Sequence, residues 1–137
     1  MNIQLLFIFL FTICFNVYSQ HEEILIKLID IKDKKFNILT ENGMVSIDEK
    51  VKEIESGNPE AMAVGINLYE ANLMEKYLKG VTNKELLSLF IEEYSLAIIR
   101  EKDLVEKMTL KNSAKKALYS LLKDEEKLIQ QLSKNIK

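Results

Sequence analysis

The chain is poor in the residues that most catalytic and metal sites need. Its 137 residues include no tryptophan, one histidine, one cysteine, one proline and four glycines. So little glycine and proline argues against an all-β fold, which needs a turn every ~10 residues. Hydrophobic residues make up 47% and charged residues 29% of the chain, proportions that are ordinary for globular proteins and argue against disorder. The length is that of a single domain.

The single histidine and single cysteine limit the chemistry further. A tetrahedral zinc site needs several histidine or cysteine ligands, and the chain offers only His21 and Cys14. Di-iron bundles use two Glu-x-x-His motifs, and the sequence contains none. Catalysis by a Ser-His-Asp or Cys-His arrangement would depend on His21 alone. We therefore predict no catalytic residues, no metal and no cofactor, and we expect a protein that is not an enzyme.

The first nineteen residues have the pattern of a secretory signal peptide. Residues 1–19 contain no Lys, Arg, Asp or Glu, and residues 3–15 are almost continuously apolar. This run is shorter than the ~20 residues of a transmembrane helix. Val17 and Ser19 fit the −3 and −1 positions of a cleavage site. We predict export to the periplasm or the exterior. The alternative is an uncleaved N-terminal anchor, because the segment begins without a basic residue.

Cys14 lies inside the apolar run and follows the bulky Ile13, so it does not fit a lipidation site. Cleavage after Ser19 would remove it and leave residues 20–137 as a single helical domain without cysteine. Such a domain would be held together by packing alone, although it would enter an oxidising compartment.

Capping signals divide the rest of the chain into helices. Ser46–Glu49 and Thr82–Glu85 have the S/T-x-x-E form of a capping box. Asn58-Pro59-Glu60 offers an N-cap, a proline at the first helical position and an acid that suits the helix dipole. These signals predict helices over residues 47–56 and 59–79, from residue 83 to about 110, and from residue 114 onward.

The segment before these helices is ambiguous. Residues 24–29 are apolar enough for a buried strand, and Asn42-Gly43 could be the turn of a hairpin. Residues 22–47 are therefore either helix or hairpin. We favour the helix, because the capping box at Ser46 leaves a second strand only a few residues. The predicted fold is an all-α bundle of four or five helices that follows a signal peptide.

Two predicted helices have apolar patterns with specific consequences. Residues 59–79 carry two apolar stripes, which predict a central helix with Leu68 and Leu73 both deeply buried. In the last helix, the charged run from Lys123 to Glu126 interrupts the apolar stripe and could bend or split the helix.

Carboxylates are the remaining candidates for acid–base chemistry. Glu92 and Glu93 are adjacent on one predicted helix, and Glu70 and Glu75 lie on another. Adjacent helical residues point about 100° apart, so Glu92 and Glu93 cannot both line one cleft. We interpret these acids as a solvated surface. Arg100 is the only arginine, and it is either a surface residue or a partner of Glu70 or Glu75.

Four tyrosines recur on the apolar stripes. We interpret Tyr69, Tyr77, Tyr94 and Tyr119 as rings that pack in the core while their hydroxyls reach a partner. The alternative is that they line a pocket for a small apolar ligand between helices.

Charge is unevenly distributed along the chain. Residues 41–101 hold twelve acids and six bases, whereas residues 102–137 hold nine bases and five acids. The basic C-terminal helix is compatible with peripheral contact to an anionic membrane, or with attraction to the acidic part of the same bundle. Nucleic acid is disfavoured as a partner by the predicted export and by the lack of arginine.

The sequence favours an interaction or structural module of the cell envelope or exterior, which would hold a protein partner. The alternative is a carrier or sensor of a small apolar ligand held between helices. The pattern of the first nineteen residues gives the most direct test. N-terminal sequencing of the exported protein is expected to begin at Gln20, or at its cyclised form. An exported chain that retains Met1 would contradict cleavage.

Overall fold

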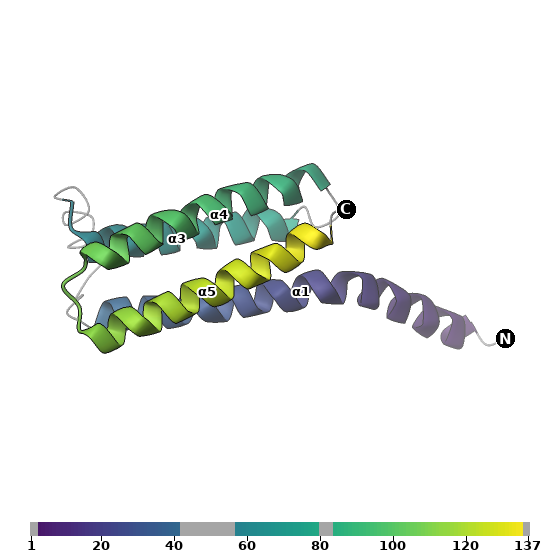
Figure 1. The fold of residues 1–137 in the computed structure, drawn as a ribbon. Helices are drawn as coiled ribbons and strands as arrows, with labels where there is room; N and C mark the ends of the chain where they lie inside the picture. Colours follow the sequence, from purple (N-terminus) through teal and green to yellow (C-terminus); the bar gives the residue numbers. More distant parts are fainter. Residues whose placement is uncertain (1–2, 42–56, 80–83, 136–137) are drawn as a thin grey trace.

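The structure, a computed structural model, describes residues 3–41, 57–79 and 84–135, with side chains from residue 21 onward except at the helix ends beside the gaps. All elements described are α-helices, and no strand occurs among these residues (Figure 1). They are α1 (Ile3–Glu41), α3 (Pro59–Lys79), α4 (Lys84–Lys107) and α5 (Asn112–Lys134). The prediction of a small all-α bundle is confirmed.

The four helices form a closed ring of neighbours. α3 contacts α1 and α4, and α5 contacts α4 and α1, so each helix has two neighbours and faces a third helix across the core. Successive helices run in opposite directions, and the first half of α1 extends beyond the ends of the other three (Figure 1). The helix α3 thus has the two neighbours that its sequence predicts, but none of the helices that the structure describes is central.

The region predicted to be a signal peptide belongs to α1, which is continuous from Ile3 to Glu41. The proposed cleavage site after Ser19 lies within this helix, and cleavage stays a prediction. Within the residues that the structure describes, no helix contains an apolar stretch long enough to cross a membrane.

The ambiguous segment is helical as far as Glu41, because α1 includes residues 22–41. The hairpin alternative is wrong, since the residues that would form its first strand belong to this helix. The predicted helix over residues 47–56, the turn Asn42-Gly43 and the capping box at Ser46 lie outside the described residues, as does Thr82 of the second box.

The start of α3 forms as its sequence predicts. The Asn58 side-chain oxygen accepts a hydrogen bond from the backbone N–H of Ala61 at 3.0 Å, which satisfies one free donor of the first turn. Pro59 is the first helical residue. Gly57, just before the cap, has a φ of 84°, a conformation that favours glycine.

The junction between α4 and α5 differs from the prediction. α4 ends at Lys107 instead of near residue 110, and α5 already begins at Asn112. Lys111 occupies the N-cap position without a side-chain hydrogen bond, so Asn112 and Ser113 do not cap the helix. The junction is held instead by α3. The Glu60 carboxylate accepts hydrogen bonds from the backbone N–H of Thr109 at 2.8 Å and from its hydroxyl at 3.2 Å.

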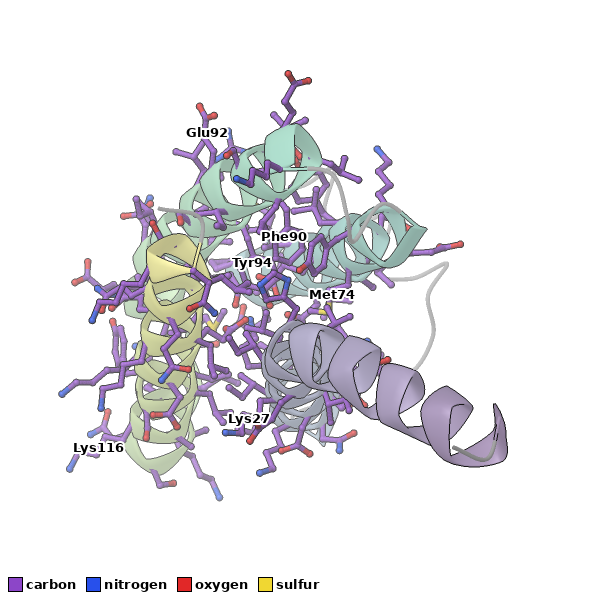
Figure 2. The ribbon with its side chains drawn as sticks, turned by 90° about the vertical axis from the view of Figure 1, so that its right-hand side faces the viewer. Lys27, Met74, Phe90, Glu92, Tyr94 and Lys116 are labelled. Carbon is purple, nitrogen blue, oxygen red and sulfur yellow. The ribbon has the colours of Figure 1, made fainter. Side chains whose placement is uncertain are left out.

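The core lies between the four helices and contains side chains from all of them. Figure 2 shows Met74, Phe90 and Tyr94 inside the bundle and Glu92 and Lys116 on its outside. The rings of Tyr77 and Phe90 stack with centroids 4.8 Å apart, and Phe90 and Tyr94 follow at 5.4 Å. These contacts join α3 and α4 by aromatic packing.

The burial of α3 corrects the prediction for Leu68. Leu73 is 4% exposed and belongs to the core, but Leu68 is 49% exposed. Met62 and Tyr69 are also exposed. The two apolar stripes of this helix therefore do not both face the core, because among the described helices only α1 and α4 contact α3, which leaves an apolar outer face.

This difference within one helix gives a matched pair of substitutions. Leu73→Ala removes buried methyl groups and leaves a cavity, and we expect a loss of about 2–5 kcal/mol in the free energy of unfolding. Leu68→Ala should change it by only about 0.5 kcal/mol, because it alters an exposed site. Urea denaturation of both variants measures the difference. If both variants lose the same free energy of unfolding, the placement of Leu73 inside and Leu68 outside the core is contradicted.

Candidate functional site

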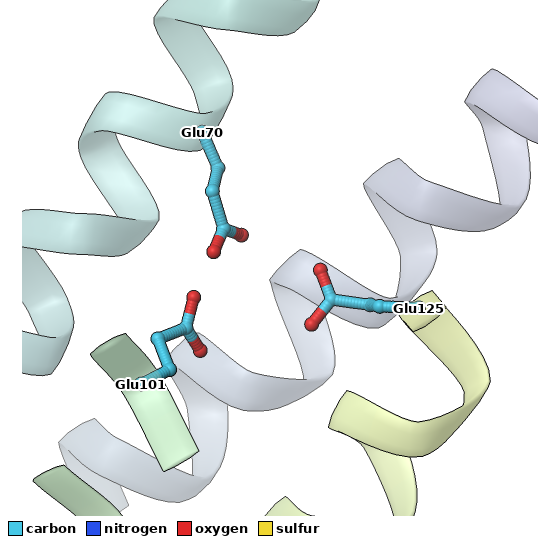
Figure 3. Close-up of side chains that lie close together, drawn as sticks. All are labelled: Glu70, Glu101 and Glu125. Atoms are coloured by element: carbon cyan, nitrogen blue, oxygen red, sulfur yellow. The ribbon is translucent and has the colours of Figure 1, made fainter. Parts of the chain in front are cut away.

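Each of the four helices places one charged residue in the middle of its buried apolar stripe. Lys35 on α1 follows the buried Leu28 and Ile31, and Glu70, Glu101 and Glu125 take equivalent positions on α3, α4 and α5. The three glutamates converge from three helices in Figure 3. Together with Tyr94 of α4, these residues form what we call the Lys35 cluster.

The ammonium group of Lys35 is the centre of the cluster. It donates to the Glu101 carboxylate at 2.8 and 2.9 Å and to the Glu70 carboxylate at 3.0 and 3.3 Å. Its Nζ also lies 2.6 Å from Oε1 of Glu125, an ion pair that satisfies this otherwise unbonded oxygen. One cation is thus shared by three carboxylates, each from a different helix.

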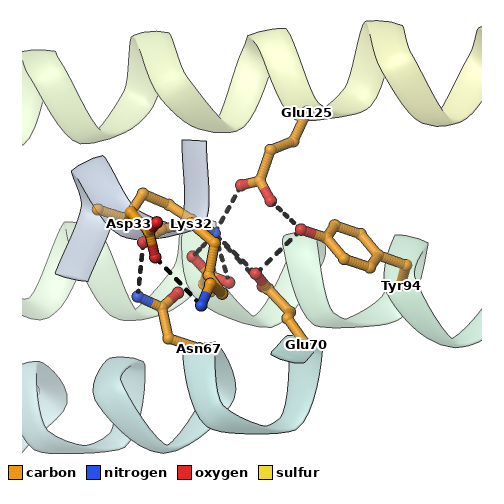
Figure 4. A network of polar contacts seen from close by, with 8 residues as sticks. Lys32, Asp33, Asn67, Glu70, Tyr94 and Glu125 are labelled. Atoms are coloured by element: carbon orange, nitrogen blue, oxygen red, sulfur yellow. Dashed lines mark hydrogen bonds and ion pairs between the residues drawn. The ribbon is translucent and has the colours of Figure 1, made fainter. Parts of the chain in front are cut away.

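Tyr94 connects two of these carboxylates. Its hydroxyl lies 2.5 Å from Oε2 of Glu125 and 3.2 Å from Oε2 of Glu70 (Figure 4). Because Glu70 and Glu125 belong to helices that face each other across the core, the hydroxyl closes a polar path from α3 to α5. A further hydrogen bond joins α3 to α1 near the cluster: the Asn67 side chain donates to the backbone oxygen of Lys32 at 3.4 Å.

The whole cluster is shielded from water. Lys35, Glu70, Glu125 and Tyr94 are 0% exposed, and Glu101 is 3% exposed. Burial raises the pKa of Glu70 from 4.5 to about 7, and the negative charge of Glu125 adds to the rise while Lys35 opposes it. Burial, together with the charges of Glu70 and Glu125, also raises the pKa of Tyr94 well above its usual value. The tyrosine is therefore a neutral hydrogen-bond donor.

The arrangement favours a structural or proton-holding role over catalysis. A catalytic acid or base must come within hydrogen-bond reach of a substrate, and these side chains contact one another instead of a cleft. A buried ion network of this kind contributes little net stability, because desolvation offsets the attraction between charges. It does specify which helices pair and in what register, since any shift would leave a buried charge without its partner.

The three carboxylates could in principle hold a metal ion, because each offers an oxygen within 4.8 Å of the others. Oxygen ligands of this kind suit calcium or magnesium. The Lys35 ammonium, however, lies among these same oxygens and already supplies the positive charge. A metal ion would have to displace it, so we assign no metal to this site.

The structure separates the carboxylates that the sequence singled out. Glu70 is fully buried in the cluster, so its interpretation as a solvated acid is wrong. Glu75 and Glu92 are exposed, as expected. Glu93 accepts a hydrogen bond from the Tyr69 hydroxyl at 3.1 Å on the surface. Arg100 is exposed, as expected of a surface residue. The alternative, a pairing of Arg100 with Glu70, is wrong, because Lys35 is the cation that binds Glu70.

The tyrosines also divide into two groups. The rings of Tyr77 and Tyr94 are buried in the core, as predicted, and the Tyr94 hydroxyl reaches two carboxylates. The expectation of a partner is wrong for the Tyr77 hydroxyl, which has none among the described residues. Tyr69 and Tyr119 are exposed, at 45% and 37%, so the expectation of core packing is wrong for them. His21 lies in α1 with intermediate exposure.

Lys35, Glu101 and Glu125 were missed from the sequence, although a signal for them exists. Glu125 lies three residues after the buried Leu122 and four before the buried Ile129, which is core spacing on a helix. The run from Lys123 to Glu126 does not interrupt α5, because only Glu125 of these four faces the core. A single charged residue at a core position in each of four helices would have indicated the cluster.

The outer side of α3 and α4 carries a groove with a volume of about 430 Å³, which we call the α3–α4 groove. Its lining is mainly apolar, with two charged residues, and comprises Met62, Gly65, Ile66, Tyr69, Ala97, Arg100, Asp103 and Leu104. Arg100 lies close enough to Tyr69 to act on its hydroxyl electrostatically.

Comparison of the chain with models of protein families, with curated proteins and with solved structures finds no match. The interpretation of the cluster and the groove therefore depends on their geometry and chemistry.

The central position of Lys35 can be tested against its neighbour in sequence. Lys35→Met leaves three buried carboxylates without their cation, and we expect a loss of about 3–5 kcal/mol in the free energy of unfolding. Lys34→Met is the matched control. Lys34 is exposed and, among the residues that the structure describes, pairs with Asp30 alone, four residues earlier, so its loss should be no more than about 0.5 kcal/mol. Urea denaturation that finds the two variants equally stable would contradict the role of Lys35.

Proposed function

We propose that the protein is an exported, non-catalytic interaction module of the cell envelope or exterior that holds a protein partner on its outer surface. The observation that carries this proposal is the α3–α4 groove, in which large apolar side chains are exposed next to charged ones. Export is supported by the pattern of residues 1–19, and the non-catalytic role by the closed, mutually paired Lys35 cluster.

The composition of the groove suits a protein partner. Of its lining residues, Met62 and Tyr69 are 38% and 45% exposed. Arg100 and Asp103 add charge beside this apolar surface. Protein interfaces combine an apolar centre, rich in aromatic residues, methionine and arginine, with a polar rim. A groove between two helices also matches the way in which an amphipathic helix binds to a helical protein.

The same groove supports the alternative of a small apolar ligand. Pockets for small molecules have volumes of roughly 300–1,000 Å³ and apolar linings with a few polar groups. The groove of about 430 Å³ lies within this range. A ligand held there would place the protein among carriers or sensors, with α3 and α4 as the two walls of the site.

A basic line on α5 supports peripheral contact with an anionic membrane as a second property of the module. Lys116, Lys123, Lys127 and Lys134 follow at intervals of seven, four and seven residues, which places them on one side of the helix. All four are exposed, and none forms an ion pair with another residue that the structure describes. Lysines on α1 and α4, such as Lys27 and Lys107, instead pair with acids of their own helix.

Two tyrosines allow the groove and the basic line to be tested separately. A photo-crosslinking phenylalanine derivative replaces either Tyr69 in the groove or Tyr119 on α5, in cells that produce the protein. We expect one discrete crosslinked product from position 69 and none from position 119, because the groove holds the partner. Met62→Glu should abolish this product by placing a charge on the apolar surface.

The other outcomes of this experiment are also informative. A lipid-sized adduct at position 69 would support the small-ligand alternative. Adducts at position 119 alone would indicate that binding occurs along the basic line of α5 and not in the groove. If neither position gives a product, the interaction module proposed here is contradicted.

A further inference from the structure

The Tyr94 hydroxyl contacts two carboxylates but has a single proton to donate. Its distance to Glu125 is 2.5 Å and its distance to Glu70 is 3.2 Å. A hydroxyl donates one hydrogen bond and offers its lone pairs to other partners. If it donates to the nearer Glu125, its lone pairs face Glu70. That contact is favourable only when Glu70 itself carries a proton and donates it to the tyrosine oxygen.

The charges that face Glu70 from the other helices lead to the same conclusion. α1 contributes the Lys35 ammonium, α4 contributes Glu101 and the neutral Tyr94, and α5 contributes Glu125. Asn67, on α3 itself, donates to the backbone of α1. One ammonium thus faces three carboxylates in a site that is at most 3% exposed. Two uncompensated charges in such a site are costly, and binding of one proton removes one of them.

We propose that the Lys35 cluster is a proton-binding site, in which one proton resides on Glu70 and completes a hydrogen-bonded path from Glu70 through Tyr94 to Glu125. With the proton bound, Glu70 donates to Tyr94, Tyr94 donates to Glu125, and Lys35 neutralises one of the two remaining carboxylates. When the proton leaves, the Tyr94 hydroxyl lies between two anions and can donate to only one. Repulsion between Glu70 and Glu125 then acts across the core and loosens the contacts of α3 and α5 with α4.

Occupancy of this site should change near neutral pH, since burial raises the pKa of Glu70 to about 7. The folded protein binds this proton more tightly than the unfolded chain, in which the group has its usual pKa near 4.5. The stabilising contribution is therefore complete below pH 4.5 and is lost as the pH rises through 7. Tyr94 has a pKa well above 10 and does not titrate in this interval.

Carbon-13 NMR of the glutamate side-chain carboxyls in the intact protein tests the proposal without destabilising it. We expect one carboxyl carbon to titrate near pH 7 while exposed glutamates titrate in their usual acidic range. This resonance should be missing from Glu70→Gln and present in the control Glu92→Gln, which alters an exposed acid. If all glutamates titrate in the acidic range, the cluster holds no proton at neutral pH and the proposal is wrong.

The pH dependence of stability provides the second measurement. With pKa values of about 7 folded and 4.5 unfolded, Glu70 alone should raise the unfolding equilibrium constant roughly 70-fold between pH 5 and pH 8. Glu70→Gln keeps the shape of the protonated acid and should lose this pH dependence of the unfolding equilibrium constant. Glu92→Gln should retain it. Identical pH profiles for Glu70→Gln and the parent protein would overturn the proposal. Neither measurement needs a partner, so its result is independent of the proposed function.

Discussion

The ion network around the Lys35 ammonium is the constraint on which the rest of the bundle depends. Apolar side chains alone would allow four amphipathic helices to slide or exchange neighbours at little cost, because one aliphatic contact resembles another. A lysine that meets three carboxylates from three other helices restricts this freedom, because each helix must place its charged residue at the same level of the bundle. The same contacts that cost desolvation energy thus select the order and the register of the helices, a use of buried polar groups that is known from coiled coils.

Much of the fold can be predicted from local signals in the sequence. The cap at Asn58, the proline at position 59 and the periodicity of residues 59–79 identify α3 with the correct ends, because capping depends only on residues within one turn. The α4–α5 junction could not be placed in this way. It is contacted by Glu60, which is 49 residues away in the sequence and accepts hydrogen bonds from Thr109. Local propensity contains no information on such a contact.

The cluster could be predicted only in part, for a related reason. Glu70 is recognisable as an acid within an apolar helix, but its partner cannot be chosen by residue type. Arg100 was a plausible cation on chemical grounds. The ring of helices instead brings Lys35 to the carboxylate, from the segment that the sequence left as helix or hairpin. Leu68 was misplaced because hydrophobicity does not reveal which of two apolar faces has a neighbour.

The cluster and the α3–α4 groove lie on two different faces of the same helical turns. Tyr69 precedes Glu70 on α3, and Arg100 precedes Glu101 on α4, so each helix presents one residue outward and the next inward. A change in the separation of α3 and α4 at the cluster would therefore alter the groove at the same level. Van der Waals contacts between the apolar side chains of the groove act only at short range, so they would be lost if α3 and α4 moved apart. The internal charges would in this way influence the shape of the outer surface.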